Sequence, residues 1–233
     1  GVWECPDLIS LTTSSGKEML VLLVSLNPGG VTGGSGTQYF IGDWDGKTFT
    51  TDQSATLWID YGRDNYAGVT FNHTPDNRRI FLGWMSNWDY ASKLPSPIWR
   101  TSMTAPRELA LLEVGGEILL TAEPLAEIKF THDDSFTISA SENALITIGQ
   151  APHLVEIRYD ATTRKISIDR STAWFAEIDD APQLSPAIEL QEFTIRTVID
   201  HGSLELFIPE AGLAMTSLHS LPASGAFLQN PAN

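Results

Sequence analysis

The sequence predicts an all-β protein, and three observations support this fold class. Short segments that alternate apolar and polar side chains recur along the chain, for example at residues 165–169 and 193–198. Turn residues separate these segments, as in Gly115-Gly116 and Asp200-His201-Gly202. No segment carries a long stripe of apolar residues at helical spacing. The 233 residues are enough for one large β domain or two ordinary ones.

The first half of the chain contains several predicted strands. Residues 19–24 form a continuous apolar run, which is typical of a strand buried on both faces. The turn Asp43-Trp44-Asp45-Gly46 separates residues 38–41 from residues 47–50, so we expect a strand, a turn and a strand. Further strands are expected at 79–84, 108–114 and 117–120, with Gly115-Gly116 closing a hairpin between the last two, and residues 122–127 are expected to form a short helix or a linker.

The second half is plainer. It contains regular alternating segments, and strands are expected at residues 136–138, 145–148, 155–159, 165–169, 193–198 and 203–207. Six of the seven tryptophans lie in the first hundred residues, and only Trp174 lies beyond them. This change of composition predicts a boundary near Pro124, between a first part (residues 1–124) that carries the chemistry and a second part (residues 125–233) built as a β-sandwich.

Composition excludes several classes of function. The net charge of −15 comes without any cluster of basic residues, so neither nucleic acid nor a membrane is expected as a partner. No run of 18 apolar residues suggests a membrane span, and no signal peptide is visible. The single Cys5 cannot form an internal disulfide, and the five histidines are scattered, so no metal and no cofactor are predicted.

Three segments contain residue types that suit catalysis or sugar binding. In Trp3-Glu4-Cys5-Pro6, a carboxyl group stands at a partly apolar strand end, which favours the protonated form that a proton donor needs. Taken alone, Glu4 is as consistent with an exposed strand edge, because glutamate is seldom buried.

The other two segments are richer in polar and aromatic groups. The stretch from Asp60 to Gly68 combines carboxylates, Arg63 and tyrosines, which suits recognition of sugar hydroxyls or, alternatively, a polar turn with an internal ion pair. The stretch from Gly83 to Tyr90 places Trp84, Asn87 and Asp89 close together, which favours the lining of a cleft as much as core packing.

In this order, the segments resemble glycoside hydrolase family 32, which contains invertases, inulinases and levanases. The resemblance is specific over residues 1–125 and weaker over the rest, where Asp200-His201-Gly202 lies in a late hairpin similar to that of the family's C-terminal part. The matching text is Trp3-Glu4-Cys5-Pro6-Asp7-Leu8, Gln38-Tyr39-Phe40-Ile41-Gly42, Asp60-Tyr61-Gly62-Arg63-Asp64-Asn65-Tyr66-Ala67-Gly68-Val69-Thr70-Phe71, Gly83-Trp84-Met85-Ser86-Asn87-Trp88, Trp99-Arg100 and Met103-Thr104-Ala105-Pro106-Arg107-Glu108-Leu109.

The resemblance implies a five-bladed β-propeller followed by a β-sandwich. Residues 1–124 would then be the later blades of the propeller, beginning in the third, and residues 125–233 the sandwich. The family uses a nucleophilic Asp, a second Asp that binds the transition state, and a Glu in a Glu-Cys motif. Only the last maps here, onto Glu4, since the Asn-Asp-Pro-Asn-Gly and Arg-Asp-Pro motifs do not occur in these residues.

The implied activity is release of fructose from sucrose or fructans with retention of configuration and Glu4 as acid and base. By the same resemblance, Asp60 and Arg63 bind the leaving sugar and Trp84 forms an aromatic wall, with Asn87 beside it in the cleft. Because the nucleophile motif is missing, we expect this chain alone to be inactive. A non-catalytic fructan-binding or structural protein and a fructosyltransferase remain alternatives. Family members act on extracellular sugars, so an extracellular or periplasmic location is expected.

Overall fold

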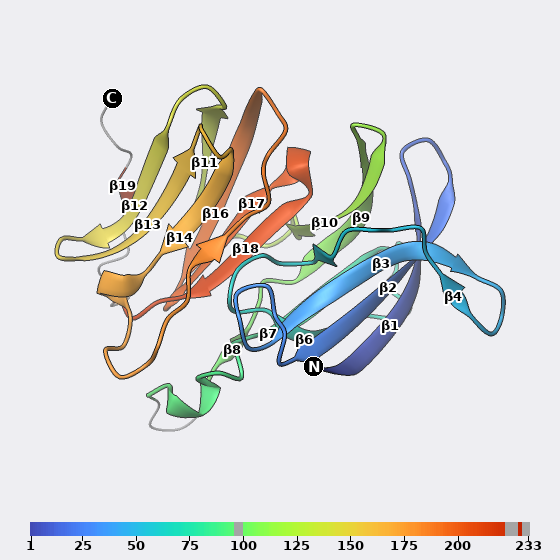
Figure 1. The fold of residues 1–233 in the computed structure, drawn as a ribbon, viewed down its shortest axis with the longest axis horizontal. Helices are drawn as coiled ribbons and strands as arrows, with labels where there is room; N and C mark the ends of the chain where they lie inside the picture. Colours follow the sequence, from blue (N-terminus) through green and yellow to red (C-terminus); the bar gives the residue numbers. More distant parts are fainter. Residues whose placement is uncertain (96–99, 222–227, 230–233) are drawn as a thin grey trace.

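A computed structural model of the chain describes residues 1–95, 100–221 and 228–229. These residues form 19 strands and three short 3-10 helices, which confirms the predicted all-β class. The strands make four sheets, two in each half of the chain (Figure 1). Within the described residues, no helix is long and apolar enough to cross a membrane.

The first sheet is antiparallel and begins at the N-terminal end of the described chain. Its strands follow the order β1-β2-β3-β4, with β5 also paired to β3. The predicted run 19–24 lies in β2, where Val21, Leu23 and Val24 are buried. The bounds are β1 Val2–Thr12, β2 Glu18–Asn27, β3 Gly36–Trp44, β4 Phe49–Thr50 and β5 Leu57–Trp58.

The second sheet has the order β10-β9-β7-β6, and β8 pairs with β7 beyond the point where β9 ends. It packs against the first sheet through a shared core that includes Val21, Leu23, Tyr39, Phe81 and Leu109. The bounds are β6 Tyr66–Thr70, β7 Arg79–Met85, β8 Ser102–Met103, β9 Arg107–Val114 and β10 Glu117–Pro124.

Two sequence expectations are revised in this half. A short helix at 122–127 was one possibility, but residues 122–124 complete β10, because they pair with residues 107–109 of β9 in a regular antiparallel register. A start in the third blade predicts strands from three blades before the sandwich, whereas residues 1–124 provide two sheets. The Gly115-Gly116 hairpin is confirmed, and both glycines adopt the positive φ that such a turn requires.

The second half contains two sheets packed face to face (Figure 1). The first has the order β11-β16-β17-β18 and the second β15-β14-β13-β12-β19. Between them lies a core of aliphatic side chains with Tyr159 and Phe193. The bounds are β11 His132–Ser139, β12 Ala144–Gln150, β13 His153–Asp160, β14 Lys165–Asp169, β15 Gln183–Leu184, β16 Glu192–Asp200, β17 Ser203–Ile208, β18 Leu213–Leu218 and β19 Leu228–Gln229, with 3-10 helices η1 Ala91–Lys93, η2 Ser171–Ala173 and η3 Pro209–Ala211.

A backbone seam joins the halves. The loop before β6 runs along β18, where the N–H groups of Tyr61, Arg63 and Asp64 donate to the carbonyl groups of Ala214 and Thr216. Gly62 is required at this seam, because a Cβ there would stand 2.2 Å from the backbone of Thr216. The loop that precedes β6 is therefore fixed by a strand of the second half.

Candidate active site around Glu4

Glu4 lies on β1, opposite Ser25 of β2, with its side chain exposed. The register of β1 shifts between Glu4 and Asp7, and Cys5 in this bulge has φ of 47°. Bulges re-aim side chains next to them, which is common beside active sites. The hydroxyl of Tyr66 on β6 donates a short hydrogen bond to Glu4 Oε2.

Tyr66 is a buried donor, only 3% exposed. Burial raises the pKa of its phenol well above the usual value, and the neighbouring Glu4 carboxylate adds to this increase. The phenol therefore keeps its proton at neutral pH and remains a donor to Glu4. It can hold the carboxyl group in one orientation.

The conformation of β6 places Tyr66. The strand has an irregular register between Tyr66 and Val69, and Ala67 takes φ of 50°. Two glycines allow the close packing around it. A Cβ at Gly68 would lie 2.0 Å from the ring of Phe81, and one at Gly83 would lie 2.2 Å from Asn65 Oδ1.

An aromatic wall, which we define as Tyr66, Trp84 and Trp88, begins at the tyrosine that contacts Glu4. The rings of Tyr66 and Trp84 meet edge to face at 6.3 Å, and those of Trp84 and Trp88 lie 5.1 Å apart. Trp84 Nε1 donates to Thr101 Oγ1 at 2.7 Å, which fixes the indole, while Trp88 is 54% exposed. An aromatic face next to a carboxyl group suits a sugar, which presents C–H patches and hydroxyls.

Asp60 lies elsewhere, in a buried ionic cluster at the seam. Its Oδ1 accepts from the N–H groups of Gly62 and Thr216, and its Oδ2 accepts from Asn65, Arg107 and the Thr216 hydroxyl. The residue is 4% exposed. Because protein donors occupy both oxygens, the geometry favours a structural role for Asp60. Its contact with a leaving sugar stays a prediction.

Arg63 and Asn87 are also buried. Arg63 donates to the carbonyl of Thr32 and to Asp89 Oδ2, the latter at 2.9 Å. Asn87 Nδ2 donates to the carbonyl groups of Gly33, Ser35 and Arg63, so its amide ties the loop between β2 and β3 to the loop before β6. The geometry favours a structural role for both, and their predicted substrate contacts remain untested.

Tyr66 therefore contacts both Glu4, through its hydroxyl, and Trp84, through its ring. Asp60, Arg63 and Asn87 instead make the framework behind the loop that leads into β6. The sequence reasoning gave Tyr66 no role, although it stands in the stretch singled out for sugar recognition. Of the Trp99-Arg100 motif, Trp99 lies outside the described residues. No group of three potential metal ligands occurs in the described parts of the chain.

Comparison with known proteins places both halves. The model of the glycosyl hydrolases family 32 N-terminal domain matches residues 1–123, and that of the family 32 C-terminal region matches residues 103–219. The levanase of Bacillus subtilis (strain 168) is 42% identical over 169 residues, covering 67% of this chain and 25% of the levanase. The extracellular exo-inulinase of Aspergillus awamori is 42% identical over 134 residues, covering 53% of this chain and 25% of that relative.

Solved structures agree with these matches. The crystal structure of exo-inulinase from Aspergillus awamori superposes with a TM-score of 0.85 at 27% identity, covering all of this chain and 55% of that one. The β-fructofuranosidase of Schwanniomyces occidentalis shares the fold, with a TM-score of 0.76 at 21% identity. The chain thus spans a quarter of the two curated relatives above and about half of these solved structures. By its match to both family models, the chain belongs to glycoside hydrolase family 32.

Proposed function

We propose that this chain carries the acid/base carboxylate and part of the sugar-binding wall of a retaining β-fructosidase that acts on fructans or sucrose. The observation that carries the proposal is the Glu4 carboxylate, held by the buried Tyr66 phenol, whose ring continues into the aromatic pair Trp84 and Trp88. The names of the relatives, levanase and exo-inulinase, support a fructan as the substrate.

The proposed reaction is a double displacement. An aspartate outside these residues attacks the anomeric carbon of the fructosyl unit, and Glu4 gives its proton to the departing glycosidic oxygen as the bond breaks. Glu4, now ionised, accepts a proton from water, which attacks the fructosyl-enzyme and releases fructose. Retention needs the two carboxyl groups roughly 5–5.5 Å apart. Tyr66 would hold Glu4 in one orientation during this cycle.

The domain arrangement belongs to the same proposal. Residues 1–124 would supply the last sheets of a five-bladed propeller and residues 125–233 its β-sandwich. The two packed sheets before Pro124 and the face-to-face sheets after it support this division. An extracellular or periplasmic location is proposed because the Aspergillus relative is an extracellular enzyme.

Replacing the acid tests the proposal. With Glu4→Gln in a protein that also carries the nucleophile segment, we expect fructose release from levan or inulin to fall about 10²–10⁴-fold, the usual contribution of a general acid/base. Glu142→Gln, at an exposed position in the sandwich, is the matched control and should retain full activity. Unchanged turnover by Glu4→Gln would refute the acid assignment.

A fructan-binding protein without catalysis is the second candidate. Such a protein would hold the sugar against the aromatic wall of Tyr66, Trp84 and Trp88 without turning it over. Isothermal titration of the chain with inulin, together with an assay for free fructose, separates the two. Saturable heat without release of fructose in every context tested would support the binding protein.

A further inference from the structure

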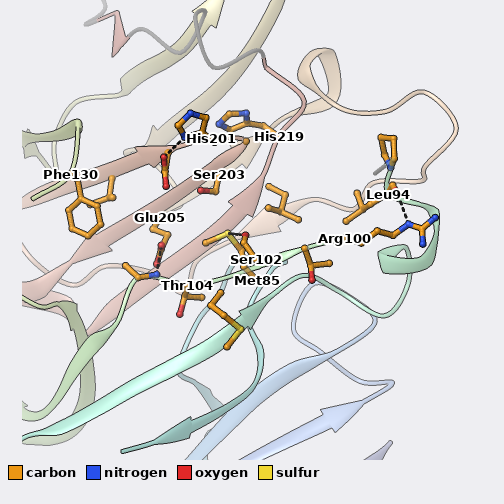
Figure 2. A pocket seen from close by; sticks show the side chains of 18 of the residues that line it. Met85, Leu94, Arg100, Ser102, Thr104, Phe130, His201, Ser203, Glu205 and His219 are labelled. Atoms are coloured by element: carbon orange, nitrogen blue, oxygen red, sulfur yellow. Dashed lines mark hydrogen bonds and ion pairs between the residues drawn. The ribbon is translucent and has the colours of Figure 1, made fainter. Parts of the chain in front are cut away.

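A cavity lies between the halves, and Glu4 is not among the residues that line it. It has a volume of about 680 Å³ and is lined by residues near β8 and by the turn that joins β16 to β17 (Figure 2). Tyr66 and Trp88 are not among its lining residues either. Its volume falls within the range of small-molecule sites, which is roughly 300–1,000 Å³.

Apolar side chains form much of the cavity wall. Phe130 and Phe175 contribute aromatic rings, and Val198, Met85 and Leu218 contribute aliphatic surface. These side chains come from both halves of the chain, so the cavity exists because the halves pack together. Such a wall suits the C–H face of a sugar ring.

Polar groups with remaining hydrogen-bonding capacity also face the cavity. The Ser203 hydroxyl makes no hydrogen bond to the described residues, and Thr101 accepts from Trp84 while its own O–H is left to donate. His219 is almost fully buried, and neither of its ring nitrogens has a hydrogen-bond partner of normal geometry among the described residues. In Figure 2, His201, Ser203 and His219 lie together along one side of the cavity.

The charges around the cavity favour an uncharged ligand. Asp200 accepts a hydrogen bond from His201 at 2.7 Å, and Arg100 supplies a positive charge on the lining. Glu205 is already bound by the N–H of Ala105 and by Arg107. Charges of both signs with hydroxyls between them suit a polyhydroxylated molecule better than an anion or a cation.

We propose that this cavity is a second sugar site, which binds a fructosyl unit of a fructan separately from the unit held at Glu4. The hydroxyls of Ser203 and Thr101 and the His201 ring would bind the sugar hydroxyls, and Phe130 and Phe175 would cover its carbon face. The choice of fructose as the sugar rests on the proposed function, whereas the cavity and its polar groups do not.

The five histidines provide a direct test, because two of them line the cavity. A ¹⁵N-labelled chain is titrated at pH 7 with a trisaccharide of one glucose and two fructose units, and the imidazole signals are followed by NMR. We expect saturable shifts of His201 and His219, with His73, His132 and His153 unchanged. Maltotriose, an oligosaccharide of matched length without fructose, should have no effect. No shift at His201 and His219, or an equal response to maltotriose, would overturn the proposal.

Two variants sharpen the test. Ser203→Val should weaken binding about fivefold to tenfold through loss of one hydrogen bond, while Ser167→Val, outside the cavity, should leave the affinity unchanged. Ser203 is buried, so its replacement could disturb folding. His201 is exposed, and His201→Ala is therefore a second variant, which should leave folding intact. Binding to this variant is followed through the NMR signal of His219. Unaltered affinity in both cavity variants would contradict the site.

A failed test of the second sugar site can be told apart from a failed test of Glu4 as the acid. Glu4→Gln, which tests the acid, should leave the His201 and His219 shifts in place. If fructose release survives Glu4→Gln but the two histidines still respond, the acid assignment fails and the second site stands.

Discussion

At the scale of single residues, the partner of Glu4 sets its behaviour. Tyr66 is 62 positions away in the chain, and its hydroxyl donates a hydrogen bond to Glu4 Oε2. A general acid/base must lie within hydrogen-bond reach of the group that it protonates, so a donor that fixes one carboxyl oxygen also directs the other. Tyr66 therefore acts through Glu4, as a positioning residue.

Tyr66→Phe tests this role. The ring remains against Trp84, but the Glu4 carboxyl group loses the donor that orients it. We expect kcat for fructose release to fall about tenfold, the value of one hydrogen bond to a charged group, with KM little changed. Trp88→Phe is a control that alters the same wall without touching Glu4. An unchanged kcat in Tyr66→Phe would show that Tyr66 does not position the acid.

His219 makes a second residue-scale prediction, about stability. Burial lowers the pKa of its imidazole from 6.5 to about 4, so the folded protein keeps it neutral. The unfolded chain takes up a proton near pH 6.5 and the folded chain near pH 4. The contribution of the neutral His219 to the free energy of unfolding is therefore fully present above pH 6.5. It is lost as the pH falls from 6.5 to 4, by up to roughly 3 kcal/mol.

The measurement is urea unfolding of the chain and of His219→Gln over that pH range. The variant should lose the part of the pH dependence that lies between pH 4 and 6.5. His153→Gln, an exposed histidine, is the control and should behave as the unaltered chain. Equal pH dependence in His219→Gln and the unaltered chain would contradict the buried neutral histidine.

Residue roles were the least predictable part from sequence. Glu4 could be singled out because it stands in a short motif followed by others in a fixed order. Asp60 stands in a polar loop, which suggests exposure, yet it is buried because Arg107 and Thr216, 47 and 156 positions away, supply its hydrogen bonds. Local sequence carries no signal for partners at such separations.

At the scale of elements, the strands of the second half could be predicted because each sheet of the sandwich buries one face, so apolar and polar side chains alternate along each strand. Residues 165–169 were predicted and form β14, with Ile166 and Ile168 buried. The 122–127 segment misled because its Ala, Glu and Leu content also suits a helix, while its pairing to β9 depends on a hairpin partner. The irregular β6 was not predicted, since the need for glycine at position 68 arises from the ring of Phe81 on β7, which leaves no room there for a Cβ.

Gly62 tests the seam between the loop before β6 and β18. A methyl group added by Gly62→Ala would collide with the Thr216 backbone, which cannot move without disturbing β18. We expect a loss of about 1–3 kcal/mol in the free energy of unfolding, as for other overpacked positions. Chemical denaturation measures it, with the exposed Ser54→Ala as control. A stability within 0.5 kcal/mol of the unaltered chain, taken as roughly the scatter of surface substitutions, would refute the close contact.

At the scale of the whole molecule, two buried arginines connect the halves. Arg107 at the start of β9 binds Asp60 of the first half and Glu205 of β17. Arg170, beside η2, binds Asp64 at 2.8 Å and also Asp180. Because both ionic clusters hold the loop that leads into Tyr66, the sandwich half contributes to the position of Glu4 although it lies outside the Glu4 site.

Arg107→Met separates this coupling from ordinary surface charge. The substitution leaves Asp60 and Glu205 buried without their cation, so we expect a loss of about 3–5 kcal/mol. Arg196→Met, which breaks the partly exposed pair with Asp133, is the matched control and should cost no more than about 1 kcal/mol. In calorimetry the unaltered chain should unfold in one transition, because the halves share these clusters, and Arg107→Met should lower or split it. If Arg107→Met instead costs no more free energy of unfolding than Arg196→Met, apolar contacts and the backbone seam alone hold the halves together. In that case the ionic cluster does not help the sandwich half to position Tyr66.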